Sequence, residues 1–157
     1  MGQVGGQSAQ QMPEEITIAP VTGEIGRSLD SFTFPSYRHL LDLTPNKRYL
    51  NDPSEPTIEP TATAAWVDSR PVGLVLATMP LQADRATRDP ELLSLLVSQE
   101  WRNHGIATRL VEAIERAVRA CGFERLGAVW MTGKPGIPAV ERVLQKRGWT
   151  APATRTV

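Results

Sequence analysis

The chain has 157 residues, 41% of them hydrophobic, which suffices for one domain with a sizeable core but not comfortably for two. Lys plus Arg equals Asp plus Glu at 17 each, so no net charge recruits nucleic acid or an anionic membrane surface. The single cysteine allows no internal disulfide, no apolar run approaches the roughly 20 residues that span a bilayer, and the N-terminus lacks the apolar middle of a signal peptide. We therefore expect a cytoplasmic protein with no nucleic-acid and no membrane partner.

The N-terminal segment differs in composition from the rest of the chain. Residues 1–14 are rich in Gly and Gln with only scattered apolar residues, which predicts a disordered leader before a single domain over residues 15–157. The run Ile16–Val21 alternates apolar and polar residues and predicts a first, edge-type strand that Pro20 closes.

Two helices and a loop are expected next. A short helix is expected from residue 22 or 23 to residue 29, and Pro35 suits the first turn of a second helix that continues to Leu43. From Thr44 to Pro60 the chain carries four prolines amid Asn, Asp and Ser, which predicts a loop.

Two β-rich runs follow, Thr61–Val67 and Val72–Thr78, joined by residues 68–71. Together they predict an antiparallel hairpin. Gly73, inside the second run, indicates a bulge or a close backbone contact.

The segment Glu91–Cys121 predicts a strand, a polar turn and a long helix. The near-continuous apolar run from Leu92 to Val97 is typical of a strand that is covered on both faces. Cys121 ends the apolar face of the helix, where we expect a small core residue, and Gly122 is expected to end the helix. The residues of that face are spaced three and four apart: Ala107, Leu110, Val111, Ile114, Ala117, Val118 and Cys121.

The C-terminal part adds one strand over residues 124–131 and a final helix over 137–147. Pro138 lies in the first turn of this helix and Gly148 ends it. Residues 149–157 are expected to supply one more strand.

The turn before the long helix reads Arg102-Asn103-His104-Gly105-Ile106-Ala107. A glycine there lets the backbone approach a ligand closely, and the first turn of a helix offers unpaired N–H groups that suit a phosphate or pyrophosphate. This stretch resembles the signature Q/R-x-x-G-x-G/A of the GNAT acyltransferases. More weakly, the resemblance extends from about Ile16 to the C-terminus.

The resemblance implies an α/β (α+β) fold. Its central sheet is mixed but mostly antiparallel, splayed between the fourth and fifth strands and flanked by about four helices. The predicted elements follow this order, but the chain stops one strand short of it. An edge left open in this way could be completed by a second copy of the chain, which would make a homodimer.

The resemblance also implies acetyl-CoA, or another acyl-CoA, as co-substrate, with no metal. The main chain of Leu95, Leu96 and Val97 would bind the pantetheine arm as an added strand does. The pyrophosphate would be held, mostly through backbone N–H groups, by Arg102, Asn103, His104, Gly105, Ile106, Ala107 and Thr108.

The implied reaction is transfer of the acyl group to a primary amine of a small molecule or protein by direct attack. Many members of the family place a tyrosine general acid in the last helix, but Val143 or Leu144 stands at that position here. Glu91, at the start of the fourth strand, is a candidate base, although a solvated carboxylate is the commoner outcome. The catalytic residues therefore stay unassigned, and a domain that binds acyl-CoA as a sensor or interaction module, with weak catalysis or none, is the alternative.

Overall fold

A five-stranded sheet forms the centre of the protein, in the order β1-β2-β3-β4-β5. Its strands are β1 (Ile16–Pro20), β2 (Ile58–Val67), β3 (Arg70–Pro80), β4 (Glu91–Val97) and β5 (Gly127–Ala128). Neighbouring strands are antiparallel except β4 and β5, which are parallel. This mixed sheet confirms the predicted fold class. The computed structural model describes residues 15–22, 29–33, 35–41, 58–80, 89–128 and 137–149.

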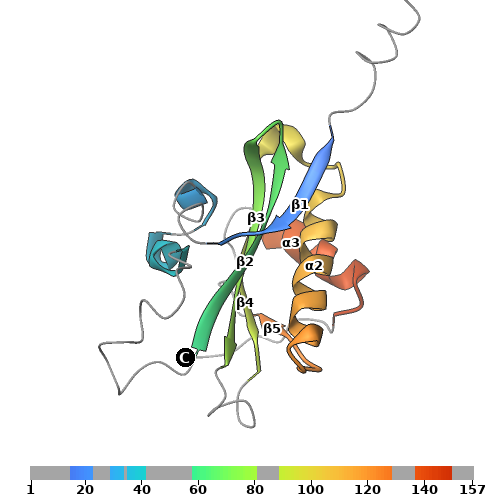
Figure 1. The fold of residues 1–157 in the computed structure, drawn as a ribbon. Coiled ribbons are helices and arrows are strands. Elements are labelled where there is room, and N and C mark those ends of the chain that lie inside the picture. The colour runs from blue at the N-terminus through green and yellow to red at the C-terminus, as the bar shows by residue number, and fades with distance from the viewer. Residues whose placement is uncertain are drawn as a thin grey trace, which may run out of the picture.

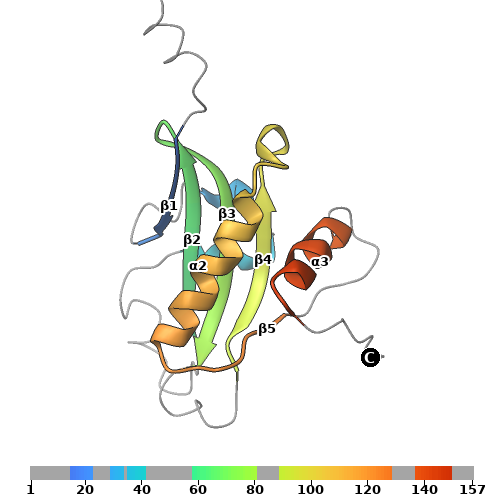
Figure 2. The ribbon, with the colours of Figure 1, turned by 90° about the vertical axis from the view of Figure 1, so that its right-hand side faces the viewer.

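Helices cover both faces of the sheet. The long helix α2 (Ile106–Ala120) crosses one face, and the short 3-10 helix η2 (Pro35–Leu41) lies against the other (Figure 1). Helix α3 (Ile137–Lys146) lies beside β4, as the turned view shows (Figure 2). A second 3-10 turn, η4 (Gln99–Trp101), connects β4 to the start of α2.

The sheet has a separate apolar core on each face because strand residues alternate in direction. In β3, Val75 and Ala77 pack against the side of α2, where Leu110 is fully buried. Leu74 and Leu76 alternate with them and pack on the η2 side. Both sets are fully buried, so β3 contributes to both cores, as β2 also does.

The hairpin between β2 and β3 is tighter than the sequence predicts. Val67 pairs with Arg70, which leaves a loop of Asp68 and Ser69 alone, with φ of 49° and 67°. Positive φ at both loop residues is the geometry of a type I′ turn, whose twist matches that of the flanking strands. The predicted four-residue connection over 68–71 was therefore wrong, because Arg70 and Pro71 already belong to β3.

Gly73 lies where α2 comes closest to β3, which confirms the predicted close backbone contact. A Cβ atom at this position would lie 3.2 Å from Leu110 Cδ1 and 3.3 Å from both Ile106 Cγ2 and the Leu96 carbonyl oxygen. Any side chain at this position would force its neighbours to shift by a few tenths of an ångström. Gly73 thereby sets how closely the first turn of α2 sits on the sheet.

The C-terminal end of α2 differs in one respect from the sequence prediction. The helix stops at Ala120, and Gly122 follows with φ of 91°, as expected of a residue that ends a helix. Cys121 is exposed to solvent, so its prediction as a core residue was wrong. The apolar face ends with Val118 because the chain leaves the helix before the next turn is complete.

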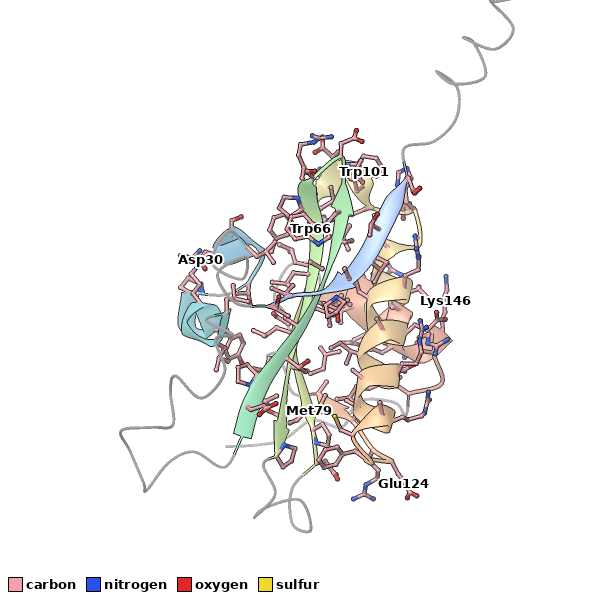
Figure 3. All side chains as sticks on the ribbon, in the orientation of Figure 1. Asp30, Trp66, Met79, Trp101, Glu124 and Lys146 are labelled. Carbon is pink, nitrogen blue, oxygen red and sulfur yellow. The ribbon has the colours of Figure 1, made fainter. Side chains whose placement is uncertain are left out.

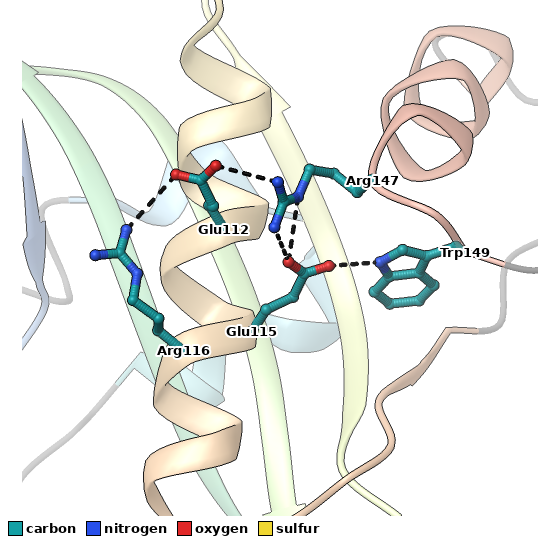
Figure 4. Close-up of polar contacts among 5 residues, drawn as sticks. All are labelled: Glu112, Glu115, Arg116, Arg147 and Trp149. Atoms are coloured by element: carbon teal, nitrogen blue, oxygen red, sulfur yellow. Dashed lines mark hydrogen bonds and ion pairs between the residues drawn. The ribbon is translucent and has the colours of Figure 1, made fainter.

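Ionic contacts fasten the end of α3 to the middle of α2 (Figure 4). Arg147 donates to Glu115 Oε1 from Nη2 at 2.6 Å and from Nε at 3.2 Å, and to Glu112 Oε2 from Nη1 at 3.1 Å. The indole nitrogen of Trp149 donates to Glu115 Oε2 at 2.8 Å. The hydrogen bond to Glu115 raises the pKa of Arg147 above its ordinary value, so Arg147 stays charged in this cluster. These contacts fix α3 relative to β4.

Several predicted segments lie outside the described residues. These are the leader 1–14, most of the helix expected before Leu29, and the strand expected after Trp149. The strand expected over 124–131 is described only at Gly127 and Ala128. Within the described part of the chain, no helix is both long and apolar enough to cross a membrane.

Candidate active site

The edge of β4 that faces β5 is the first part of the site. Pairing with β5 is described only at Glu91 and Leu92, although β4 continues to Val97. Along its other edge β4 pairs with β3 up to Val97, and Ser98 N extends this register by donating to Val72 O at 2.8 Å. Among the described residues, β4 from Leu93 to Val97 therefore has no strand partner on this edge, which we call the open edge.

The hydrogen-bond phase of β4 determines which groups point to that edge. Backbone groups of an antiparallel strand alternate between its two neighbours. Because Ser98 is bonded to β3, Leu96 and Ser94 are also directed to β3, whereas the N–H and C=O groups of Leu95 and Val97 point away from it. Of the three residues predicted to bind through their main chain, Leu95 and Val97 thus face the open edge. The backbone N–H and C=O groups of Leu96 point to β3, and the residue is 38% exposed.

A bulge interrupts β4 directly after its last described pair with β5. Leu76 pairs with Ser94, but the next residue of β3, Ala77, pairs with Leu92, so Leu93 is an extra residue in β4. A bulge of this kind increases the local twist of a strand.

A buried hydrogen bond links β4 to the segment before η2. Thr33 Oγ1 and Ser94 Oγ lie 2.7 Å apart, and the two residues are only 9% and 6% exposed. At this burial, solvent has little access to replace either partner. The pair therefore ties the η2 side of the protein to β4 directly beside the bulge. Sequence reasoning missed Thr33 because nothing local marks a contact across 61 positions.

Ser94→Ala should lower the free energy of unfolding by roughly 1–3 kcal/mol, because it leaves the Thr33 hydroxyl buried without its partner. Thr33→Val should have a similar effect. The double variant should lose much less free energy of unfolding than the sum of the two single losses, because no buried hydroxyl is then left without a partner. Urea unfolding of the four proteins measures this, and strictly additive losses would contradict the pairing.

The turn between η4 and α2 forms the second part of the site. Asn103 and Gly105 both have left-handed backbone conformations, with φ of 67° and 76°. Arg109 N makes the first helical bond, to Gly105 O at 3.1 Å, so the N–H groups of the preceding first-turn residues have no acceptor within the helix. These groups belong to Ile106, Ala107 and Thr108. No acidic side chain in the first turn neutralises this positive end of the helix.

His104 folds back onto the turn itself. Its Nδ1 lies 2.9 Å from Arg102 O and 3.1 Å from Trp101 O, and its ring centroid is 5.4 Å from that of Trp101. Carbonyl oxygens only accept, so Nδ1 carries the proton. Trp66 and Trp101 mark this end of the sheet, where the β2–β3 hairpin also turns (Figure 3). The imidazole thus holds the shape of the turn, and only its other nitrogen is available to a ligand.

The acid–base candidates lie away from the open edge. Glu91 is exposed and pairs with Thr78 and Gly127, at the end of β4 where β4 and β5 are joined. Leu95 is four residues further along, about 13 Å for an extended strand. In α3, Leu144 is buried and Val143 half-buried, so neither position predicted for a tyrosine offers a hydroxyl. The described residues contain no group of three or more His, Cys, Asp or Glu side chains placed to hold a metal ion.

Residues 27–149 match the acetyltransferase (GNAT) family. No curated protein matches the chain at a significant level of sequence similarity. Among solved structures, the ribosomal-protein-alanine N-acetyltransferase of Brucella melitensis is similar at a TM-score of 0.63 and 16% identity, over 91% of this chain and 98% of that one.

Two further structures resemble the chain. The aminoglycoside N-acetyltransferase AAC(6')-Iy, solved in complex with CoA, has a TM-score of 0.66 and 15% identity, over 94% of this chain and 95% of that one. A putative acetyl transferase from Pyrococcus furiosus has a TM-score of 0.59 and 19% identity, over 91% of this chain and 98% of that one. Identities this low show a shared fold. The family match over most of the chain shows that the protein is an acetyltransferase of the GNAT family.

Proposed function

We propose that the protein transfers an acetyl group from acetyl-CoA to a primary amine, which attacks the thioester directly. The observation that carries the proposal is the common end of β4 and α2. There the outward peptide groups of Leu95 and Val97 stand one short turn away from the free N–H groups of Ile106 to Thr108. One neighbour of similar fold was solved with CoA bound.

Each part of this site suits a different part of CoA. The pantetheine arm contains two amides, which can pair with Leu95 and Val97 as an added strand would. The pyrophosphate carries negative charge, which suits the amino end of α2 and the left-handed turn at Asn103 and Gly105. Because the two parts are adjacent, one extended molecule would reach both.

The transfer needs a neutral amine, a stabilised oxyanion and a protonated leaving thiolate. In our proposal the amine nitrogen bonds to the carbonyl carbon while the carbonyl oxygen takes up negative charge, which the Val97 N–H stabilises. The carbon–sulfur bond then breaks, and the proton that the nitrogen loses balances the one that the thiolate gains. Holding amine and thioester side by side supplies much of the rate even without a dedicated acid.

A second function, binding of acyl-CoA without efficient catalysis, is favoured by one specific observation. Leu144, at a position where a tyrosine acid was expected, is only 3% exposed and belongs to the packing of α3. The chain has two tyrosines, and neither Tyr37 nor Tyr49 lies in this helix. A sensor or interaction module would need the residues that bind CoA but not a general acid for catalysis.

One experiment separates these functions. Calorimetry measures binding of CoA to the purified protein, and release of free thiol from acetyl-CoA is followed with a panel of aminoglycosides, polyamines and peptides with N-terminal alanine. Binding together with amine-dependent thiol release supports the transferase. Binding with no turnover above background for any amine supports the module, and absence of binding contradicts both.

Gly105→Asn should weaken CoA binding at least tenfold while lowering the melting temperature by only a few degrees. Asparagine adopts the left-handed conformation more readily than most residues, and nothing lies within 4 Å of a Cβ at this position, so backbone strain is the main cost to the fold. The new side chain would stand where the backbone must approach the pyrophosphate. Asn103→Gly is the matched control, since it keeps a left-handed residue and adds no atoms. Calorimetry showing equal CoA affinity for the two variants would contradict this prediction.

A further inference from the structure

Arg102 makes a contact that neither the family match nor the proposed reaction assigns. Its Nε donates a hydrogen bond of 3.1 Å to the carbonyl oxygen of Val97, the last residue of β4. By the phase of the strand, this carbonyl points to the open edge, where no described strand supplies a donor. The guanidinium of Arg102 therefore donates to a carbonyl oxygen of the open edge.

The same residue closes the turn through its main chain. Arg102 N donates to Gln99 O at 3.3 Å, and Trp101 N donates to Ser98 O at 2.9 Å. The Arg102 carbonyl in turn accepts from His104 Nδ1. Arg102 is thus bonded to the end of β4, to η4 and to the turn before α2, the three segments that set where β4 ends relative to where α2 begins.

Two roles are open to an arginine at this place, and they require different atoms. An arginine that binds pyrophosphate acts through its charge, which lysine also carries. An arginine that holds a carbonyl through Nε needs only an N–H donor four bonds from Cα, with or without charge. Glutamine has such a donor in Nε2, whereas the charged Nζ of lysine is one bond further out. Methionine has a similar length but no donor. The side chains of Gln, Met and Lys therefore separate donor from charge.

We propose that Arg102 is a positioning residue for CoA. Through Nε it holds the Val97 carbonyl, and this bond fixes the spacing between the open edge of β4 and the free N–H groups of α2 so that one CoA molecule engages both. The edge then offers a ligand the Leu95 N–H and C=O groups and the Val97 N–H, and no longer the Val97 carbonyl. This inference rests on the proposed CoA binding.

The test is calorimetric titration of CoA into the full chain and its R102Q, R102M and R102K variants. We expect R102Q to bind within about threefold of wild type and R102M to bind about tenfold more weakly, as expected from one lost hydrogen bond. Melting temperatures are recorded alongside. Arg102 is exposed, so all variants should fold, and R102Q and R102M should melt within a few degrees of each other.

The outcomes are distinct. Recovery of affinity by R102Q but not R102M supports the positioning role, because those two proteins differ in a donor and not in charge. Equal losses in R102Q and R102M, with R102K the nearest to wild type, would overturn it in favour of a phosphate ligand. Unchanged affinity in all three would also overturn it. If wild type itself bound no CoA, the proposed function would fail first.

Discussion

Leu95→Pro should leave the sheet folded and weaken CoA binding at least tenfold. Proline removes the backbone N–H of residue 95, which points away from β3, so no bond of the β3–β4 ladder is lost. The open edge loses a donor that the proposed pantetheine contact requires, and the ring narrows access to the edge. Circular dichroism and calorimetry together measure the two effects. Leu95→Ala serves as control, since it removes the side chain but keeps the N–H.

Leu96→Pro, one residue further on, should do the opposite. Its N–H is directed to Leu74 in β3, so proline breaks a ladder bond in a central pair of strands. We expect a loss of about 3 kcal/mol or more, enough to unfold much of the protein. Equal destabilisation by the two prolines would show that the phase of β4 is wrongly assigned. Wild-type CoA affinity in Leu95→Pro would show that this edge is not where pantetheine binds.

Leu110→Ala should lower the free energy of unfolding by roughly 3–4 kcal/mol, because Leu110 is fully buried at the contact between α2 and β3. Gly73→Ala should cost about 1–3 kcal/mol for the opposite reason, since its methyl group would lie 3.2 Å from Leu110 Cδ1 and press α2 away from the sheet. Chemical unfolding monitored by tryptophan fluorescence gives both values.

The double variant, with alanine at both positions, is the sharper test. The methyl group of residue 73 would then point into the space that the leucine leaves, so the combined loss should fall short of the sum by about 1 kcal/mol. Full rescue is not expected, because the Leu96 carbonyl oxygen also lies 3.3 Å from the new Cβ. Additive losses would mean that the two residues do not share a contact.

The elements with a strong hydrophobic period were predictable from the sequence. For α2 the spacing of three and four gives the face that packs on β3, and the glycine at 122 gives its end. The hairpin turn was less readable because Asp68-Ser69 lacks the glycine that usually marks a type I′ turn. Cys121 was misplaced because periodicity says which face a residue occupies, but not whether the helix reaches it.

The candidate site was predictable in its chemistry but not in its geometry. The glycine-containing turn before an amphipathic helix indicates a phosphate-binding site, and the apolar run before that turn indicates a strand. Which peptide groups of that strand face outward depends on the register with β3 and on the bulge at Leu93, neither of which is encoded locally. The contacts of Ser94 with Thr33 and of Arg102 with Val97 also arise only when the chain folds.

The proposed binding of CoA along β4 has a consequence for the lifetime of the protein. A ligand that completes a sheet is part of the folding equilibrium, and free CoA at a hundred times its dissociation constant would add about 2.7 kcal/mol to the free energy of unfolding. Thermal resistance and resistance to proteolysis should then rise with CoA concentration. If CoA binds as proposed, the amount of intact protein would thus rise with the supply of CoA.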